Sequence, residues 1–162
     1  MRGRGVIRGP STSLVVGAVQ LVSYTDQHGE SRAKAGRLRL ALIDLADEAM
    51  IGSVLREHVE PGAVMRSDGW RGYSIMALKG FQHDQRLVGN PGRAPIVAPH
   101  IHRVFANLNT WLIGTHHGVE PRDLPNDLDA FVFRFNRRHT PRAACQTVRG
   151  IASGKKPVTR AQ

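Results

Sequence analysis

The stretch from residue 100 to residue 118 constrains this chain most, because it combines a helical apolar stripe with polar groups at fixed positions. Pro99 suits the start of a helix here and Gly114 its end. At about 100° per residue, His102 and Asn109 project in nearly the same direction, roughly 10 Å apart along the axis. They flank one apolar face, formed by Ile101, Val104, Phe105, Leu108, Trp111 and Leu112. The stretch predicts a buried helix with two polar groups beside its core face; a core helix with a merely polar rim is the alternative.

The charge of the chain favours a polyanionic partner. The 162 residues suffice for one domain with a core, and 41% hydrophobic with 22% charged residues is typical of a globular protein. The net charge of +10 points first to nucleic acid, although a basic surface without a partner is the alternative. Four basic sets could bind phosphates without reading base sequence: Arg2, Arg4 and Arg8; Arg32, Lys34, Arg37 and Arg39; Arg134, Arg137, Arg138 and Arg142; and Lys155, Lys156 and Arg160.

The single cysteine, Cys145, excludes a disulfide within the chain and a zinc site built on cysteines. We expect it to be a core thiol, and the cysteine usage fits a reducing cytoplasm. No apolar run approaches the about 18 residues of a membrane span, so we expect no membrane partner. The basic start of the chain is not read as a signal peptide.

Turn-forming residues and the apolar runs between them predict an α/β order of elements, with antiparallel strands first. Asp44 or Asp47 caps the first helix, whose core face is formed by Met50, Ile51, Val54 and Leu55. Strands are expected at 14–22, 37–43, 63–67 and 82–88, with the first two antiparallel, and a short helix at 74–80.

A last helix is expected to start near Asp123 and to turn Leu124, Leu128 and Phe131 inward. The chain is expected to divide into a basic Gly/Arg-rich loop or disordered arm at 1–13, a domain at 14–146 and a disordered basic tail at 147–162.

Asp68 is the best single candidate for chemistry, because it follows a strand and precedes a Gly-rich turn, where open α/β sheets place their sites. Such a carboxylate suits Mg²⁺, and a turn-forming role is the alternative. His100 and His102 lie two residues apart at a helix start and do not share a face, so a joint metal site is not expected. The same holds for the pair at 116–117.

Six blocks follow one another along the chain: VVGAV at 15–19, RLRLA at 37–41, VEPG at 59–62, SDGWRGY at 67–73, HRVFANL at 102–108 and FRFNRR at 133–138. Together they resemble the ISXO2-like transposase domain, a DDE-type catalytic core of insertion sequences. The resemblance runs from about residue 3 to residue 145. It implies a ribonuclease-H-like mixed sheet with flanking helices. It also implies cleavage and strand transfer of DNA, both transposon ends and target, with Mg²⁺ or Mn²⁺, and it allows a homo-oligomer.

The resemblance also assigns roles to individual residues. Of three active-site positions, the second matches Asp68 and the third His102, which are thereby expected to be catalytic residues and metal ligands. Asn109 stands where a Lys is usual, seven residues later. The expected DNA contacts are Asn109, Arg103, Arg134, Arg137 and Arg138.

Two departures from the family pattern concern activity. The opening aspartate of the family lies in a strand upstream of a Gly/Arg-rich loop that residues 2–9 resemble, so this central strand is missing, and Asp26 and Asp44 lie in the wrong places to replace it. Asn109 replaces a phosphate-contacting Lys. We therefore expect an amino-terminally truncated transposase with little or no strand transfer as this chain alone. A non-catalytic, basic DNA-binding remnant is the alternative.

Overall fold

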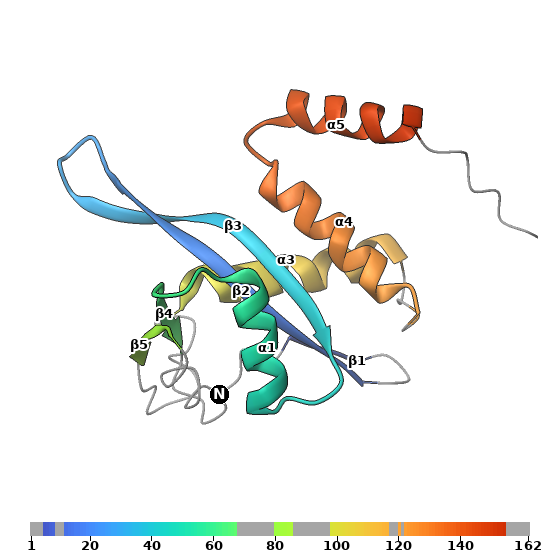
Figure 1. The fold of residues 1–162 in the computed structure, drawn as a ribbon. Helices are drawn as coiled ribbons and strands as arrows, with labels where there is room; N and C mark the ends of the chain where they lie inside the picture. The colour runs from blue at the N-terminus through green and yellow to red at the C-terminus, as the bar shows by residue number, and fades with distance from the viewer. Residues whose placement is uncertain are drawn as a thin grey trace, which may run out of the picture.

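The computed structural model describes residues 5–8, 12–67, 80–85, 98–116, 120 and 122–154. It is a mixed α/β arrangement (Figure 1). In chain order the elements are β1 (Gly5–Arg8), β2 (Thr12–Thr25), β3 (Ser31–Ile43), α1 (Glu48–His58), β4 (Val64–Ser67), β5 (Gln82–Gln85), α3 (Pro99–His116), α4 (Leu124–Asn136) and α5 (Pro141–Gly154).

A long antiparallel hairpin of β2 and β3 organises the molecule, which confirms the predicted strands at 14–22 and 37–43. Both strands are longer than predicted and extend beyond the helices as an arm that turns at residues 26–30 (Figure 1). Successive side chains of a strand point to opposite faces. The apolar residues of β2 are therefore shared between two helical layers, one on each face of the hairpin.

The first face packs against α3 and α4, and it holds the larger core cluster: Val15, Leu38, Val104, Leu108, Leu112, Leu124, Leu128 and Phe131. The predicted stripe of α3 is confirmed, since Ile101, Phe105 and Trp111 pack against this cluster. Gly17 allows the close approach of α3. A Cβ there would lie 2.9 Å from Leu40 Cδ2 and 3.0 Å from Phe105 Cζ, so at least one of these side chains would have to shift.

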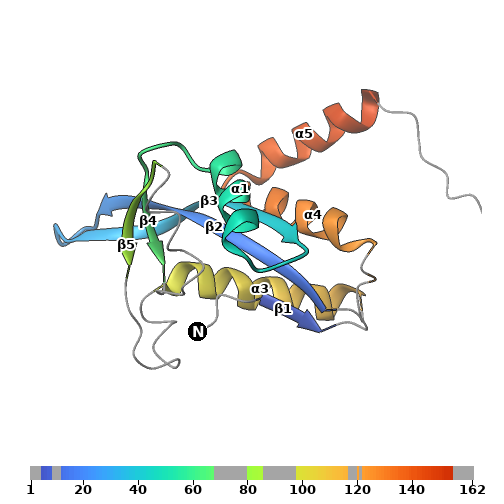
Figure 2. The same ribbon diagram turned by 60° about the horizontal axis from the view of Figure 1, so that its bottom comes forward.

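The second face packs against α1, through Ile43 of β3 and Ile51 and Leu55 of the helix (Figure 2). The predicted cap and core face of α1 are confirmed. The Asp47 carboxylate accepts a hydrogen bond from the Met50 amide at 2.7 Å and so satisfies one free amide of the first turn. Because α1 and α3 hold opposite faces, the hairpin is the middle layer of the domain.

The single mixed sheet that was expected is replaced, in the described residues, by two sheets. One has the order β1-β2-β3, and the other is the parallel pair β4-β5. β1 pairs only with the stretch Thr12–Val15, so it covers only the start of the β2 edge. No described strand lies along the rest of that edge, and the two ladders therefore do not join.

The outer edge of β3 is closed by a side chain. Asn136, at the end of α4, accepts a hydrogen bond from the Leu38 amide at 2.7 Å and donates one to the Leu38 carbonyl at 3.0 Å (Asn136 Oδ1 and Nδ2). It thus forms the two bonds that a neighbouring strand would make. An edge strand exposes unpaired backbone groups that invite foreign strands, so this contact both fixes α4 on the hairpin and protects the edge.

Several expectations need correction. The loop expected at 1–13 is wrong for Gly5–Arg8, because β-branched Val6 and Ile7 pair with the β2 edge. The disordered tail expected from residue 147 is wrong up to Gly154, since α5 continues there with Cys145, Val148 and Ile151 recurring every third residue.

Two smaller corrections concern single residues. Cys145 is exposed rather than in the core. α3 continues past Gly114 to His116, since a glycine weakens a helix without ending it. The short helix expected at 74–80, apart from Gly80, lies outside the described residues, as do positions 86–88 of the strand that begins at Gln82.

None of the helices in the described ranges is both long enough and apolar enough to cross a membrane.

We predict that Asn136→Ala lowers the free energy of unfolding by about 2 kcal/mol, because two hydrogen bonds are lost and the Leu38 amide loses its partner. Urea denaturation of both proteins measures this. Asn126→Ala is the matched control, since Asn126 is an exposed asparagine of the same helix and its removal should change stability by under about 0.5 kcal/mol. Equal losses in the two variants would contradict the role given to Asn136.

Candidate nucleic-acid and metal site

The short parallel sheet leads the chain to its first candidate residue. Two side-chain contacts join its strands: Arg66 Nε to Asp84 Oδ2 at 2.9 Å, and Ser67 Oγ to His83 Nε2 at 2.7 Å. Ser67 is buried, and Asp68 follows it directly. These contacts hold β4 in register on β5 and so fix where the chain leaves the strand. Asp68 itself lies outside the described residues.

α3 carries two further candidates in the arrangement that the periodicity predicts. His102 is half-buried in the first turns, and Asn109 is exposed two turns later. Arg103 is exposed beside His102. In Figures 1 and 2, β4 lies at the end of the molecule where α3 begins. The carboxyl end of β4 and the half-buried imidazole therefore belong to the same end of the domain.

The three arginines near the end of α4 differ in what they contact. Arg134 is exposed and makes no ion pair in the described part of the chain. The Arg137 guanidinium lies over the Phe133 ring, 4.1 Å from its centroid, and is half-buried. Cation–π contacts of this kind favour a fixed orientation but leave the edge of the guanidinium open to other partners.

Arg138 is held by the protein itself. Its Nη2 donates to the Ala35 carbonyl, and its Nη1 donates to the carbonyls of Phe135 at 2.8 Å and Gly36 at 3.4 Å. Its guanidinium also lies 4.1 Å from the centroid of the Phe135 ring. Arg138 therefore ties α4 to β3 next to the Asn136 contact. Whether it also contacts DNA stays a prediction.

Sequence reasoning missed the two residues with the most specific polar contacts, His83 and Asn136. Asn136 carried a signal, because an uncharged amide follows the last apolar residue of the helix, Phe135, and precedes two arginines. His83 carried none, since its partner Ser67 lies 16 residues away and only the pairing of β4 with β5 brings them together.

A metal site was expected at Asp68 and His102. In the described ranges no three His, Cys, Asp or Glu side chains converge as metal ligands would. One imidazole and one carboxylate are fewer ligands than a two-ion site needs, and Mg²⁺ prefers oxygen ligands to imidazole. The residues at hand therefore do not by themselves fit a two-ion site.

Comparison with protein-family models gives a match to the ISXO2-like transposase domain over residues 1–136. The chain belongs to this transposase family. The resemblance drawn from the six sequence blocks is thereby confirmed. Neither the curated proteins nor the solved structures give a significant match.

The matched part of this transposase domain runs from β1 to the last residue of α4, so it includes Asn136 with its contact to Leu38. It stops before Arg138 and before α5. The elements that bury the core thus lie inside the family match, together with β4 and α3, whereas the candidate residues Arg137 and Arg138 follow it.

We predict that Arg138→Ala destabilises the transposase domain by about 1 kcal/mol, below the 1.5–3 kcal/mol usual for charge-assisted hydrogen bonds because the side chain is exposed. Arg134→Ala, which removes the same charge from the last turn of α4 without breaking a described contact, should change stability little. Chemical denaturation of the two variants tests this. If both are as stable as the parent, Arg138 does not anchor the helix.

Proposed function

We propose that this chain acts on DNA in the transposition of an insertion sequence, as part of a transposase catalytic core. The match over residues 1–136 carries the proposal, because it extends through every element that builds the domain up to the end of α4. The net charge of +10 supports DNA as the partner, since basic proteins gain binding free energy by releasing the counterions of the phosphate backbone.

The arrangement of layers supports a ribonuclease-H-like core. An antiparallel hairpin lies between α1 on one face and α3 with α4 on the other, and a parallel strand follows α1. In such a core the acidic residue after that strand would lie near the start of α3. In Figures 1 and 2, β4 and the start of α3 lie at the same end of the molecule, which agrees with this.

Within this proposal Asp68 and His102 are the metal ligands and catalytic residues, and Arg103, Asn109, Arg134 and Arg137 contact DNA. Arg138 anchors the end of α4 on β3 and also contacts the DNA backbone. Asp68 and His102 would hold a Mg²⁺ or Mn²⁺ ion, which would supply activation of a water or 3′-hydroxyl for phosphoryl transfer, although these two residues do not complete a two-ion site. The protein residues position the DNA for that step through phosphate contacts, which fix register without reading sequence.

The positions of the carboxylates limit the chemistry that these 162 residues can perform alone. Residues 1–25 contain neither Asp nor Glu, and the strand β3 contains none, so the three-stranded sheet offers no carboxylate. Asp26 is the first, and its side chain is used in the hairpin turn, where it accepts hydrogen bonds from the amides of His28 and Glu30. We propose that these residues alone bind duplex DNA without cutting or joining it.

Binding and nicking assays on the purified chain test both parts of the proposal. We expect dissociation constants of about 10⁻⁴–10⁻⁶ M for duplex DNA near physiological salt, weakening as salt rises. We expect no more Mn²⁺-dependent nicking than with Asp68→Ala. Nicking that disappears in both Asp68→Ala and His102→Ala would contradict the inactive state. Failure to bind duplex even at low salt would contradict the DNA partner.

A non-catalytic DNA-binding role predicts the same binding but gives Asp68 no part in metal binding. Electron paramagnetic resonance of added Mn²⁺ separates the two. The catalytic-core proposal predicts weak Mn²⁺ binding that Asp68→Ala removes, whereas equal binding by both proteins favours the non-catalytic role.

A further inference from the structure

The arm of β2 and β3 carries basic residues whose spacing in the sequence would place them on both faces of a regular strand. In a regular strand residues 34 and 39 are an odd number apart, so their side chains would point to opposite faces. The pairing of the two strands is not regular, however. Val19 pairs with Leu38 and Leu21 pairs with Ala35, so one residue of β2 opposes two of β3. This is a β-bulge, formed at Gly36 and Arg37.

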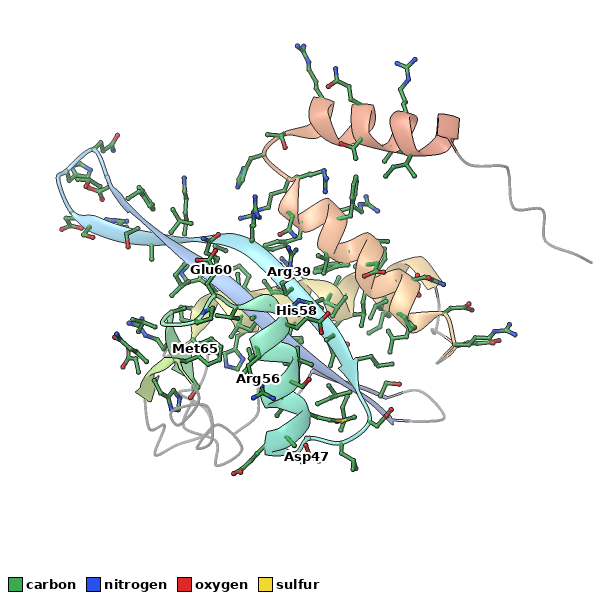
Figure 3. The ribbon with its side chains drawn as sticks, viewed as in Figure 1. Arg39, Asp47, Arg56, His58, Glu60 and Met65 are labelled. Atoms are coloured by element: carbon green, nitrogen blue, oxygen red, sulfur yellow. The ribbon has the colours of Figure 1, made fainter. Side chains whose placement is uncertain are left out.

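The bulge brings the basic residues onto one face. Leu38 is buried in the cluster with α3 and α4, so its neighbours Arg37 and Arg39 point to the other face, on the side of α1. Ala18 confirms this, since it opposes Arg39 and packs in the α1 cluster. Figure 3 shows Arg39 on β3 in the same region as His58 at the end of α1.

Beyond the bulge the same face continues on the arm. A Cβ on Gly36 would lie 2.8 Å from Gln20 Oε1 and 2.9 Å from Val22 Cγ2, so this position also faces the α1 side, and a larger residue there would have to displace these side chains. Lys34 pairs with Val22 across the ladder and therefore points the same way. Its ammonium lies 5.5 Å from the centroid of the Tyr24 ring on that face.

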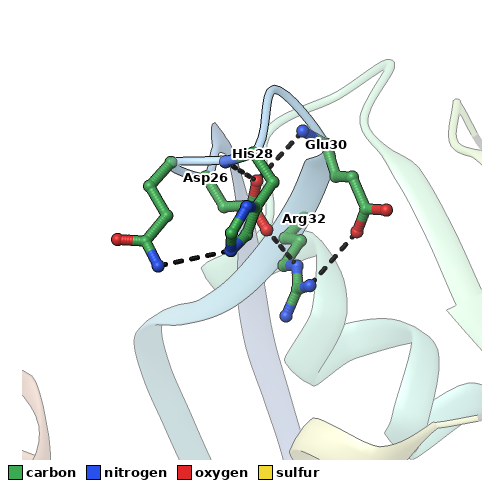
Figure 4. Close-up of polar contacts among 5 residues, drawn as sticks. Asp26, His28, Glu30 and Arg32 are labelled. Atoms are coloured by element: carbon green, nitrogen blue, oxygen red, sulfur yellow. Dashed lines mark hydrogen bonds and ion pairs between the residues drawn. The ribbon is translucent and has the colours of Figure 1, made fainter.

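We name Lys34, Arg37 and Arg39 the basic arm face. All three are exposed, and none makes an ion pair in the described ranges. Their neighbours on β2 are uncharged: Gln20, Val22 and Tyr24. Arg32 is different, because it pairs with Asp26 at 2.6 Å and with Glu30 at 3.1 Å, and these contacts close the tip of the arm (Figure 4). On the arm, the positive charge that remains open to a partner is therefore carried by Lys34, Arg37 and Arg39.

We infer that the basic arm face binds the phosphate backbone of double-stranded DNA. This inference rests on the proposed function and adds to it the surface that contacts the DNA. At about 3.3 Å per residue, Lys34 and Arg39 stand about 15 Å apart, which corresponds to about four base-pair steps of rise along the duplex axis. Exposed cations on a projecting antiparallel ribbon suit a continuous polyanion better than a compact anion, because they are spread along the strand instead of meeting at one point.

Equilibrium binding of a short duplex, measured by fluorescence anisotropy over a series of salt concentrations, tests the inference. Lys34→Ala, Arg37→Ala and Arg39→Ala should each weaken binding about fivefold to tenfold near 0.1 M salt. Each should also reduce the slope of log K against log salt by about 0.9. Arg122→Ala is the matched control, because Arg122 is an exposed arginine paired with Glu120, and its removal should leave the slope unchanged.

A charge swap decides whether the face or the net charge matters. Ala33 is exposed and points to the opposite side of the arm, so the double variant Ala33→Lys with Lys34→Ala keeps the charge and moves it across the ribbon. The inference predicts that this variant binds as weakly as Lys34→Ala. Binding restored to the parent level would overturn it.

Two other results would also overturn the inference, and they differ in what they say about the proposed function. If the parent binds duplex and none of the three substitutions weakens binding more than Arg122→Ala, the surface is wrong while DNA remains the partner. If the parent does not bind duplex even at low salt, the DNA partner and the surface fail together. Circular dichroism and thermal denaturation of each variant confirm that the exposed substitutions leave the fold intact.

Discussion

The contact between the Asn136 side chain and the Leu38 backbone is the constraint on which the rest of the structure depends. It joins the end of α4 to the outer edge of β3 by an acceptor and a donor from one rigid amide. Leu38 is fully buried and packs with residues of α3 and α4, so the amide pair and the core cluster fix the same point of the strand. The hydrogen bonds of the amide and the burial of the apolar cluster therefore favour the same position of α4 on the hairpin.

The same anchor sets the geometry of the arm. Arg138 follows Asn136 by two residues and donates to the carbonyls of Ala35 and Gly36, at the bulge itself. The Arg37 amide donates to Gln20 Oε1 at 3.3 Å from the other side of the bulge. A β-bulge is a local break in the ladder, and here side chains from both sides satisfy the backbone groups that the break frees. The face that carries Lys34, Arg37 and Arg39 is thus determined by residues 98 or more positions away in the chain as well as by its own strand.

Much of this fold follows from the sequence, and the reasons for the misses are physical. The α3 stripe, the two hairpin strands and the Asp47 cap depend on local periodicity and on a side chain three residues from its target, so single-sequence reasoning finds them. β1 and α5 were missed because Gly and Arg in those segments suggest loops, while pairing with β2 and a three-residue apolar repeat override that preference. The bulge leaves no mark in the sequence beyond Gly36, whose requirement appears only when Gln20 and Val22 lie opposite it.

The candidate site was predictable only in part. His102 and Asn109 lie on α3 as the periodicity indicates, whereas the structural use of Arg138 and the Ser67–His83 contact depend on tertiary pairing that no local pattern reports. The family match ties these elements to transposition, and the hairpin anchored by α4 carries the basic arm face that we propose for DNA.

The most direct test of this account is the hydrogen exchange of the Leu38 amide, followed by nuclear magnetic resonance in the free protein. If Asn136 holds the edge of β3, this amide exchanges as slowly as the core of the β2–β3 ladder, because it opens only when the helix leaves the hairpin. Exchange at the rate of an unprotected edge amide would show that α4 does not anchor the strand. The side-chain anchor that the account places beside the bulge would then be absent.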